Sequence, residues 1–169
     1  YQQLGVQPDI VAFSKKAQLG GVMAGGRVDE VADNVFQVSS RINSTWGGGL
    51  TDMVRARRIL EIVETEGLIE AAVGKGERFL TGLRAIAATH PGQVSNPRGR
   101  GLFLAVDLPD RAARDRVISE LYEREQVIVL ACGERSVRLR PALSVSNDEI
   151  DEALAALSRV IDSVLDSGR

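Results

Sequence analysis

The chain has 169 residues, of which 44% are hydrophobic and 26% charged, a composition typical of globular proteins. Its 21 basic and 23 acidic residues give a net charge of −2, which excludes the basic excess of a phosphate-driven nucleic-acid binder. No apolar run approaches the roughly 20 residues that span a bilayer, and no signal peptide is visible, so we expect a cytoplasmic protein without a membrane partner. A single cysteine and a single histidine disfavour a disulfide framework, a zinc site and His-based nucleophilic catalysis.

The first fifty residues contain short apolar runs separated by glycine pairs. The runs lie at Asp9–Phe13, Gly21–Ala24 and Val35–Val38. Their β-favouring side chains and glycine turns predict strands rather than helices. The chain starts at Tyr1 with a stretch that is typical of the middle of a protein, so we expect it to be a piece of something longer.

From Thr51 the pattern becomes helical. The apolar positions that recur near a 3.6-residue period are Val54, Ile59, Ile62 and Val63. Gly67 is expected to end or kink this helix. A second helix is predicted from about Leu68 to Ala88, and Pro91 stops it. The arginines between the apolar positions of the first helix, Arg55, Arg57 and Arg58, indicate a solvated face or an interface.

The remaining residues predict a compact α+β unit with the order β–α–β–β–α. The strands are expected at Leu102–Val106, Val127–Leu130 and Ser136–Arg140. Asp110 can cap the helix after the first strand, and Ser146 with Glu149 forms a capping box before the last helix. The apolar stripe of that last helix is Ile150, Leu154, Leu157, Ile161 and Val164.

Lys15 and Lys16 are the first candidates for chemistry. They follow an apolar strand and precede Gly20 and Gly21. A lysine at such a strand end can lie in a pocket, where desolvation frees an amine as a nucleophile. A pair of solvated surface lysines fits the same pattern, and the spacing alone favours this second interpretation.

Three further groups of residues are candidates. The backbone N–H groups and hydroxyls of Asn43–Gly49, just before a helix, suit a phosphate, although a tight turn explains them equally. Arg138 and Arg140 lie two positions apart on a strand and could form a carboxylate clamp or surface ion pairs. Cys132 is predicted to be a small packed residue and His90 a loop residue.

Four of these segments, in this order, resemble the class III (ω-) aminotransferases. Pro8–Lys15 resembles the segment of the Schiff-base lysine, and Ser44–Gly48 resembles the Ser/Thr-Thr-aromatic-Gly-Gly element of that family. Gly99–Leu102 and Val137–Pro141 resemble its small-domain strands. The resemblance covers essentially the whole chain. It implies an α/β fold of fold type I that depends on pyridoxal 5′-phosphate (PLP), with the end of the large domain at residues 1–50, connecting helices at 51–90 and a C-terminal small α+β domain at 91–169.

Within the family, the chain is most similar to the enzymes that act on the ε-amino group of L-lysine. Arg27–Phe36, Leu50–Leu60 and the unusual Trp46 carry this likeness. It implies ping-pong transamination of L-lysine and 2-oxoglutarate to 2-aminoadipate 6-semialdehyde and glutamate. Ornithine, acetylornithine and 4-aminobutyrate are the alternative amino donors.

The resemblance also implies a role for individual residues. Lys15 would form the Schiff base with the cofactor and then move a proton. Thr45 would bind the cofactor phosphate in the active site of the partner subunit, so the site implies a homodimer. Arg138 would hold the α-carboxylate of 2-oxoglutarate or glutamate.

Some features of the family pattern are missing. Gly49 stands where the family often has Asn. The Asp that pairs with the pyridine nitrogen, the glycine-serine phosphate turn and the ring-stacking aromatic do not occur in this sequence, so we expect the chain alone not to transaminate. A non-catalytic α+β interaction module, with Lys15 and Thr45 as ordinary surface residues, is the alternative from another class.

Overall fold

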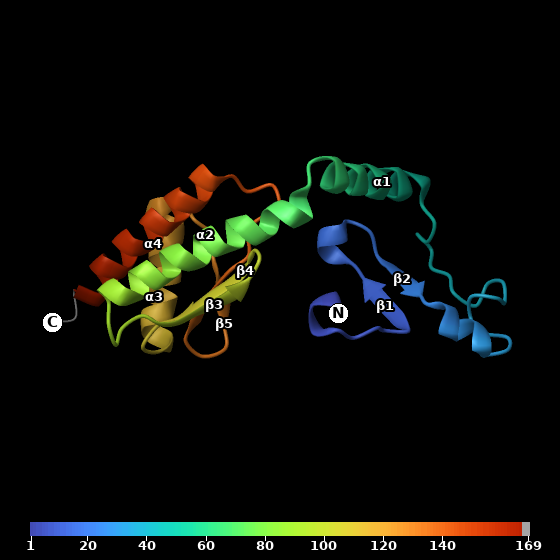
Figure 1. Cartoon of the computed structure of the whole chain (residues 1–169), viewed down its shortest axis with the longest axis horizontal. Coiled ribbons are helices and arrows are strands. Elements are labelled where there is room, and N and C mark those ends of the chain that lie inside the picture. The colour runs from blue at the N-terminus through green and yellow to red at the C-terminus, as the bar shows by residue number, and fades with distance from the viewer. Residues whose placement is uncertain (167–169) are drawn as a thin grey trace. The chain divides into compact units, whose positions relative to one another are not determined.

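A computed structural model describes residues 1–166, which divide into two compact units (Figure 1). Unit 1 comprises residues 1–66, and unit 2 comprises the described residues from 67 onward. No helix among the described residues is long and apolar enough to cross a membrane.

Unit 1 is built around one hairpin. Strand β1 (Ile10–Phe13) pairs antiparallel with β2 (Gly21–Ala24), with Phe13 opposite Gly21. A Cβ atom at Gly21 would lie 2.5 Å from the Phe13 ring, so any side chain there would displace that ring. The first two predicted strands are therefore confirmed. Three short 3-10 helices flank them: η1 (Gln2–Leu4), η2 (Lys15–Ala17) and η3 (Gly26–Glu30).

The third predicted strand, Val35–Val38, is wrong because this segment forms turns around Asn34. Asn34 is buried, and its side-chain amide donates to the carbonyls of Val28 and Val31, both at 3.1 Å. Its Oδ1 accepts from the N–H of Phe36 at 3.0 Å. These local hydrogen bonds satisfy backbone groups that a strand would have offered to a neighbouring strand.

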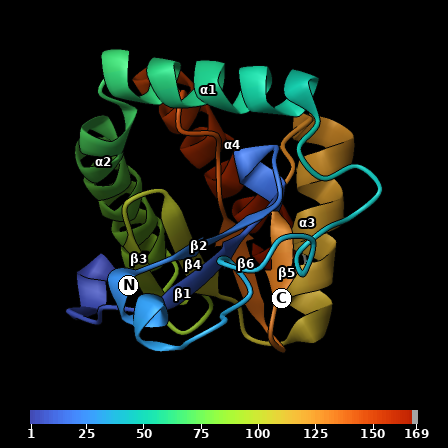
Figure 2. The ribbon, with the colours of Figure 1, turned by 90° about the vertical axis from the view of Figure 1, so that its right-hand side faces the viewer.

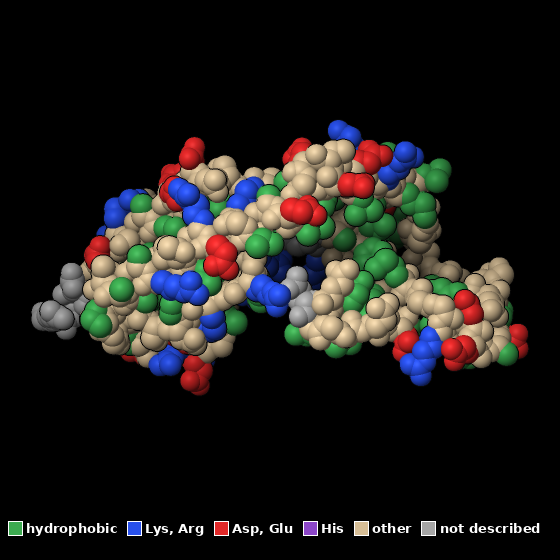
Figure 3. Space-filling model, in the orientation of Figure 1, with side chains coloured by type: hydrophobic (Ala, Val, Ile, Leu, Met, Phe, Trp, Pro, Cys, Tyr) green, Lys and Arg blue, Asp and Glu red, His purple; other side chains and the backbone are tan. Residues whose placement is uncertain are grey.

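Unit 1 ends with helix α1 (Leu50–Thr65), which confirms the first predicted helix. No residue of α1 is buried, and Figure 3 shows hydrophobic side chains at the surface of unit 1. The arginines of α1 are exposed and form ion pairs along the helix. Arg55 pairs with Asp52 at 3.3 Å, and Arg57 pairs with Glu61 at 2.9 Å, one helical turn away.

Unit 2 packs three helices against one sheet. Its elements are α2 (Leu68–Thr89), β3 (Ser95–Arg100), β4 (Phe103–Asp107), α3 (Arg111–Glu125), β5 (Leu130–Cys132), β6 (Ser136–Leu139) and α4 (Asn147–Asp166). The sheet is antiparallel with the order β3-β4-β6-β5 (Figure 2). Its core joins residues of every layer that are fully shielded from solvent, namely Leu83, Val106, Val117, Val137, Ile150 and Ile161.

Both predicted caps of unit 2 are confirmed. The N–H of Ala113 donates to Oδ1 of Asp110 at 2.8 Å, which fixes the start of α3. At the start of α4, the N–H of Ser146 donates to Glu149 Oε2 at 2.7 Å, and the N–H of Glu149 donates to Ser146 Oγ at 3.1 Å. The predicted apolar stripe of α4 faces the core.

Two strand predictions in unit 2 need correction. Strand β3 was not predicted because Ser95–Arg100 is polar, contains Pro97 and lacks an alternating apolar pattern. The strand predicted at Val127–Leu130 starts only at Leu130. The N–H of Val127 instead donates to the carbonyl of Leu121, at the end of α3.

The prediction for the single cysteine is wrong, whereas the prediction for the single histidine is confirmed. Cys132 is exposed on β5 rather than packed. His90 caps α2 and has a side chain that is only 10% exposed, with Nε2 2.7 Å from Asp162 Oδ1 of α4. It lies just after the last residue of α2, as predicted, and its side chain also links α2 to α4.

Candidate active site

Lys15 lies at the end of β1, where the backbone turns sharply. Ser14 is extended, Lys15 has a φ of 59°, and the N–H of Gln18 donates to the Lys15 carbonyl at 2.8 Å. A non-glycine residue in this left-handed conformation is uncommon and is often found at functional sites. The side chain is exposed, and it makes no ion pair or hydrogen bond within the described part of the chain.

Thr45 lies in a glycine-rich turn before α1. The N–H of Gly47 donates to the carbonyl of Ser44 at 3.0 Å, and Gly48 has a φ of 74°. Gly49 provides no side-chain cap for α1, so the N–H groups at this helix start remain available to an anion. The tight turn and the phosphate site were alternatives in the sequence, and the turn itself is confirmed.

A cavity of about 660 Å³ borders this turn within unit 1. Its wall includes β2 residues and the turn residues Ser44, Gly47 and Gly48. The segment that was wrongly predicted as a strand forms another part of the wall, through Val35 and Phe36. The turns around Asn34 therefore shape one side of this cavity.

Arg138 lies on β6 of unit 2, in register with Ala105 of β4 and Leu130 of β5. Its Cζ lies 6.0 Å from the centre of the Phe103 ring. Its Nε is buried and has no hydrogen-bond partner among the described residues. A cavity of about 390 Å³ adjoins this guanidinium, with Arg98, Arg100, Phe103 and Cys132 among its lining residues. Arg138 can therefore offer N–H donors to a carboxylate.

Arg98, next to Arg138 in this cavity, is neutralised by a buried carboxylate. Its Nη1 lies 2.8 Å from Asp107 Oδ1, which also accepts a 2.6 Å hydrogen bond from Ser136 Oγ. Asn96 Nδ2 donates to Oδ2 of Asp107 at 3.0 Å. Burial by itself raises the pKa of Asp107, but the hydrogen bonds from Ser136, Asn96 and Arg98 outweigh it and hold the pKa below its usual range.

Sequence analysis did not predict this network. Its members come from three strands that are antiparallel neighbours, and one of them, β3, was not predicted at all. A polar residue at the end of the apolar run that forms β4, Asp107, was the only available signal.

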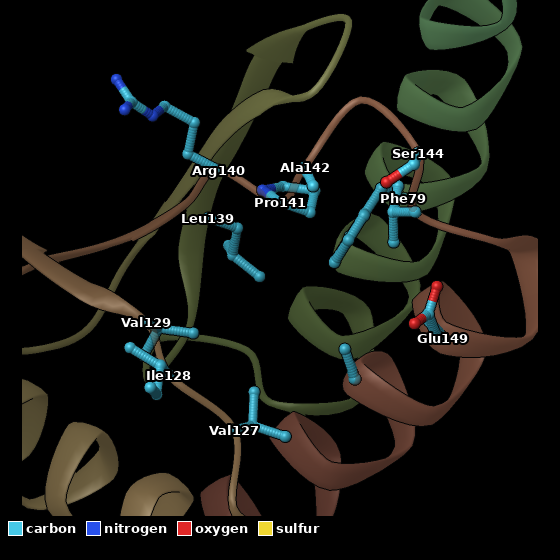
Figure 4. A pocket seen from close by; sticks show the side chains of 12 residues that line it. Phe79, Val127, Ile128, Val129, Leu139, Arg140, Pro141, Ala142, Ser144 and Glu149 are labelled. Atoms are coloured by element: carbon cyan, nitrogen blue, oxygen red, sulfur yellow. The ribbon is translucent and has the colours of Figure 1, made fainter. Parts of the chain in front are cut away.

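The predicted clamp of Arg138 and Arg140 does not form. Strand β6 ends at Leu139, and Pro141 cannot donate a backbone hydrogen bond to continue it. Arg140 borders a different cavity, of about 370 Å³, and its side chain extends away from the apolar side chains that line that cavity (Figure 4). Lys15 and Thr45 thus belong to unit 1, and Arg138 alone represents the predicted site in unit 2.

Comparison with known proteins finds one family. The sequence model described as "Aminotransferase class-III" matches residues 1–161. The chain is 56% identical over 167 residues to an L-lysine-epsilon aminotransferase of Streptomyces clavuligerus, covering 99% of this chain and 36% of that protein. It is 61% identical over 157 residues to an L-lysine-epsilon aminotransferase of Mycobacterium tuberculosis, covering 93% of this chain and 35% of that protein.

The structural comparison agrees with the sequence comparison. A solved structure described as lysine aminotransferase from M. tuberculosis in the internal aldimine form matches with a TM-score of 0.91 and 59% identity. The match covers 97% of this chain and 38% of that one. The chain therefore spans about a third of the length of the curated relatives that it resembles.

Proposed function

The chain belongs to the class-III aminotransferase family and has its fold, and from this premise we propose that the protein transfers the ε-amino group of L-lysine to 2-oxoglutarate. The products would be 2-aminoadipate 6-semialdehyde and glutamate. The observation that carries the proposal is the likeness of nearly the whole chain to relatives that are named for lysine. The chain spans about a third of the length of those relatives, so the proposal concerns the complete protein that carries this chain.

The residues of unit 1 fit the cofactor of this family. An exposed primary amine at Lys15 can hold an aldehyde carbon, and the Thr45 hydroxyl with the adjoining N–H groups can hold a phosphate. PLP, when bound, would supply the electron sink of the reaction. Lys15 would then act as the base that removes a proton from the ε-carbon of lysine in the first half of the cycle, and as the acid that delivers a proton to the α-carbon of glutamate in the second half.

Arg138 would bind the α-carboxylate of 2-oxoglutarate or glutamate. Its side chain lines the cavity and makes no ion pair among the described residues, so a carboxylate that enters the cavity would supply the missing counter-charge. Arg98 is unsuited to this role because Asp107 already neutralises it. One arginine of this face would thus recognise the substrate, while its neighbour supports the sheet.

We further propose a cytoplasmic homodimer in which Thr45 serves the active site of the partner subunit. The exposed apolar side chains of unit 1, which include Ile42, Trp46, Leu50 and Leu60, support an interface. Residues 1–50 would complete the large domain, and residues 51–90 would lead from it to the small domain of residues 91–169, with α2 packed in the core of the latter.

The test is an assay of the complete protein that carries this chain, loaded with PLP. With 2-oxoglutarate as acceptor, we expect a higher kcat/KM for L-lysine than for ornithine, acetylornithine or 4-aminobutyrate. Lys15→Ala should lower kcat by at least the factor of about 10²–10⁴ that a general base contributes, whereas Lys75→Ala on α2 should leave it unchanged. A preference for another donor would support a different ω-aminotransferase, and a Lys15→Ala enzyme with full activity would refute the role of Lys15.

A further inference from the structure

One face of the sheet of unit 2 carries Arg138 with an aromatic ring beside it. Side chains two positions apart on a strand point to the same face, so Phe103 and Ala105 of β4 share a face. Arg138 lies opposite Ala105 in the register, and the small Ala105 side chain leaves room for its guanidinium. The Phe103 ring lies next to it, with its centre 6.0 Å from Arg138 Cζ, at the limit of a cation–π contact.

Phe103 is a bulky apolar residue that the fold does not use for its core. Its neighbours on β4, Leu104 and Val106, are buried beneath the helices, whereas Phe103 is 57% exposed. It lines the same cavity of about 390 Å³ as Arg138. Because this ring does not pack in the core, it can contact Arg138 and a ligand in the cavity.

The two arginines of this cavity are held in opposite ways. Arg98 is fixed by the carboxylate of Asp107 and by Ser136, which occupy its donors. Arg138 has an aromatic neighbour instead of an acid, and its Nε keeps no partner among the described residues. An aromatic ring restrains a guanidinium through its face and leaves the N–H edge available, whereas an acid would neutralise it.

We propose that Phe103 is the positioning residue that orients Arg138 toward the carboxylate of the keto-acid substrate. This inference rests on the proposed role of Arg138 and adds a second residue to the recognition of that substrate. Phe103 does not touch the reacting atoms. Without the Phe103 ring, Arg138 would keep its charge, but its guanidinium would adopt more orientations. Forming a bidentate contact with the carboxylate would then cost more conformational entropy.

The experiment uses the complete PLP-loaded protein and measures both substrates separately. Phe103→Leu, which keeps an apolar side chain, should raise the KM for 2-oxoglutarate about three- to fivefold, as expected for the loss of one cation–π contact at an exposed site. The kcat and the KM for L-lysine should not change. Phe103→Tyr should restore the KM to within about twofold, because the ring is retained.

A matched control is Tyr122→Leu, which removes an exposed aromatic side chain from α3 that does not line this cavity, and it should leave every constant unchanged. Arg138→Gln should raise the KM for 2-oxoglutarate more than Phe103→Leu does. In an Arg138→Gln background, Phe103→Leu should add no further increase, since the two residues act together.

The outcomes separate the two levels of the proposal. If Arg138→Gln raises the KM for 2-oxoglutarate but Phe103→Leu does not, the role of Phe103 is overturned and that of Arg138 stands. A Phe103→Leu variant that loses kcat or lysine affinity to the same degree would reveal a merely structural role. If neither substitution affects 2-oxoglutarate, the proposed role of Arg138 fails, and the role of Phe103 fails with it.

Discussion

Units 1 and 2 differ in how much of their apolar surface they bury. In unit 2, helices α2, α3 and α4 enclose a continuous core against the sheet. In unit 1, Asn34 is the only buried residue among those whose exposure is described, and apolar side chains such as Trp46 (87% exposed) lie open. Unit 2 therefore has the packing of an independent fold, whereas unit 1 is held mainly by backbone hydrogen bonds and turns.

The hydrophobic core and the residues proposed to hold the cofactor lie in different units. The residues proposed to hold the cofactor, Lys15 and Thr45, are in the unit without a core, and their backbone is set by turns. Arg138 is in the unit with a core, where strand register fixes its neighbours. The residues proposed to hold the cofactor therefore lie in a unit whose exposed apolar side chains offer a surface on which further protein can pack.

The largest effect on stability is expected from a cavity in unit 2. Leu83→Ala on α2 removes a side chain that is fully buried, which should lower the free energy of unfolding by about 2–5 kcal/mol. Urea unfolding of the 169-residue chain measures this loss, and hydrogen exchange assigns it to α2, α3 and α4. Unchanged exchange in these helices would show that unit 2 does not unfold as one core.

The next largest effect is expected at the buried carboxylate. Asp107→Asn leaves Arg98 without its counter-charge and should cost about 1–3 kcal/mol at pH 7. The folded-state pKa of Asp107 lies below its ordinary value, so the carboxylate stabilises the fold above that ordinary pKa and loses this effect as the pH falls through the folded-state pKa.

The free energy of unfolding should therefore differ most between the unsubstituted chain and Asp107→Asn at neutral pH, and this difference should shrink in acid. Asp52→Asn is a suitable control, because it removes an exposed ion pair of α1 and should cost less than about 1 kcal/mol. A difference that stays constant through the acid range would contradict the assignment of a lowered pKa to Asp107.

A smaller effect is expected at the start of α4. Ser146→Ala removes the hydroxyl that accepts from the N–H of Glu149 and should lower the free energy of unfolding by about 1 kcal/mol. The exposed Ser144, two residues earlier, provides the control, and Ser144→Ala should stay within about 0.5 kcal/mol. Equal effects of both substitutions would mean that the capping box does not stabilise α4.

The smallest effect is expected for the same kind of substitution in unit 1. Leu60→Ala on α1 truncates a side chain that is 68% exposed and should change the free energy of unfolding of this chain by no more than about 0.5 kcal/mol. It matches Leu83→Ala in chemistry and secondary structure, so the pair isolates burial. A cost of several kcal/mol in the isolated chain would contradict the claim that unit 1 buries less apolar surface than unit 2. A larger cost in the complete homodimer than in the isolated chain would locate α1 at an interface.

Most of the fold could be predicted because its helices are amphipathic and their ends carry local signals. The period of Val54, Ile59 and Ile62 marked α1, and Asp110 and Ser146 marked the starts of α3 and α4. Strand β3 and the turns at Val35–Val38 escaped because their hydrogen bonds depend on distant residues or on a single buried amide, which no periodicity reports.

The site was less accessible to pattern analysis than the fold. Lys15 and Thr45 became candidates with a role through a family resemblance, since spacing alone could not distinguish them from surface residues. The surroundings of Arg138 depend on strand register, which brings Phe103 and Asp107 of β4 beside β6 although about thirty residues separate the two strands in the sequence. The break between Arg138 and Arg140 followed from Pro141, a signal that was present in the sequence.

The most direct test of the central claim is to trap the cofactor on its lysine. The complete protein is incubated with PLP, reduced with borohydride, digested and mapped by mass spectrometry. The chain offers three lysines, Lys15, Lys16 and Lys75. The account predicts that, within this chain, the modification lies on Lys15, that Lys15→Ala abolishes it and that Lys75→Ala does not. A modification on Lys16 or Lys75, or its persistence in the Lys15→Ala variant, would contradict the assignment of Lys15 as the cofactor-binding residue.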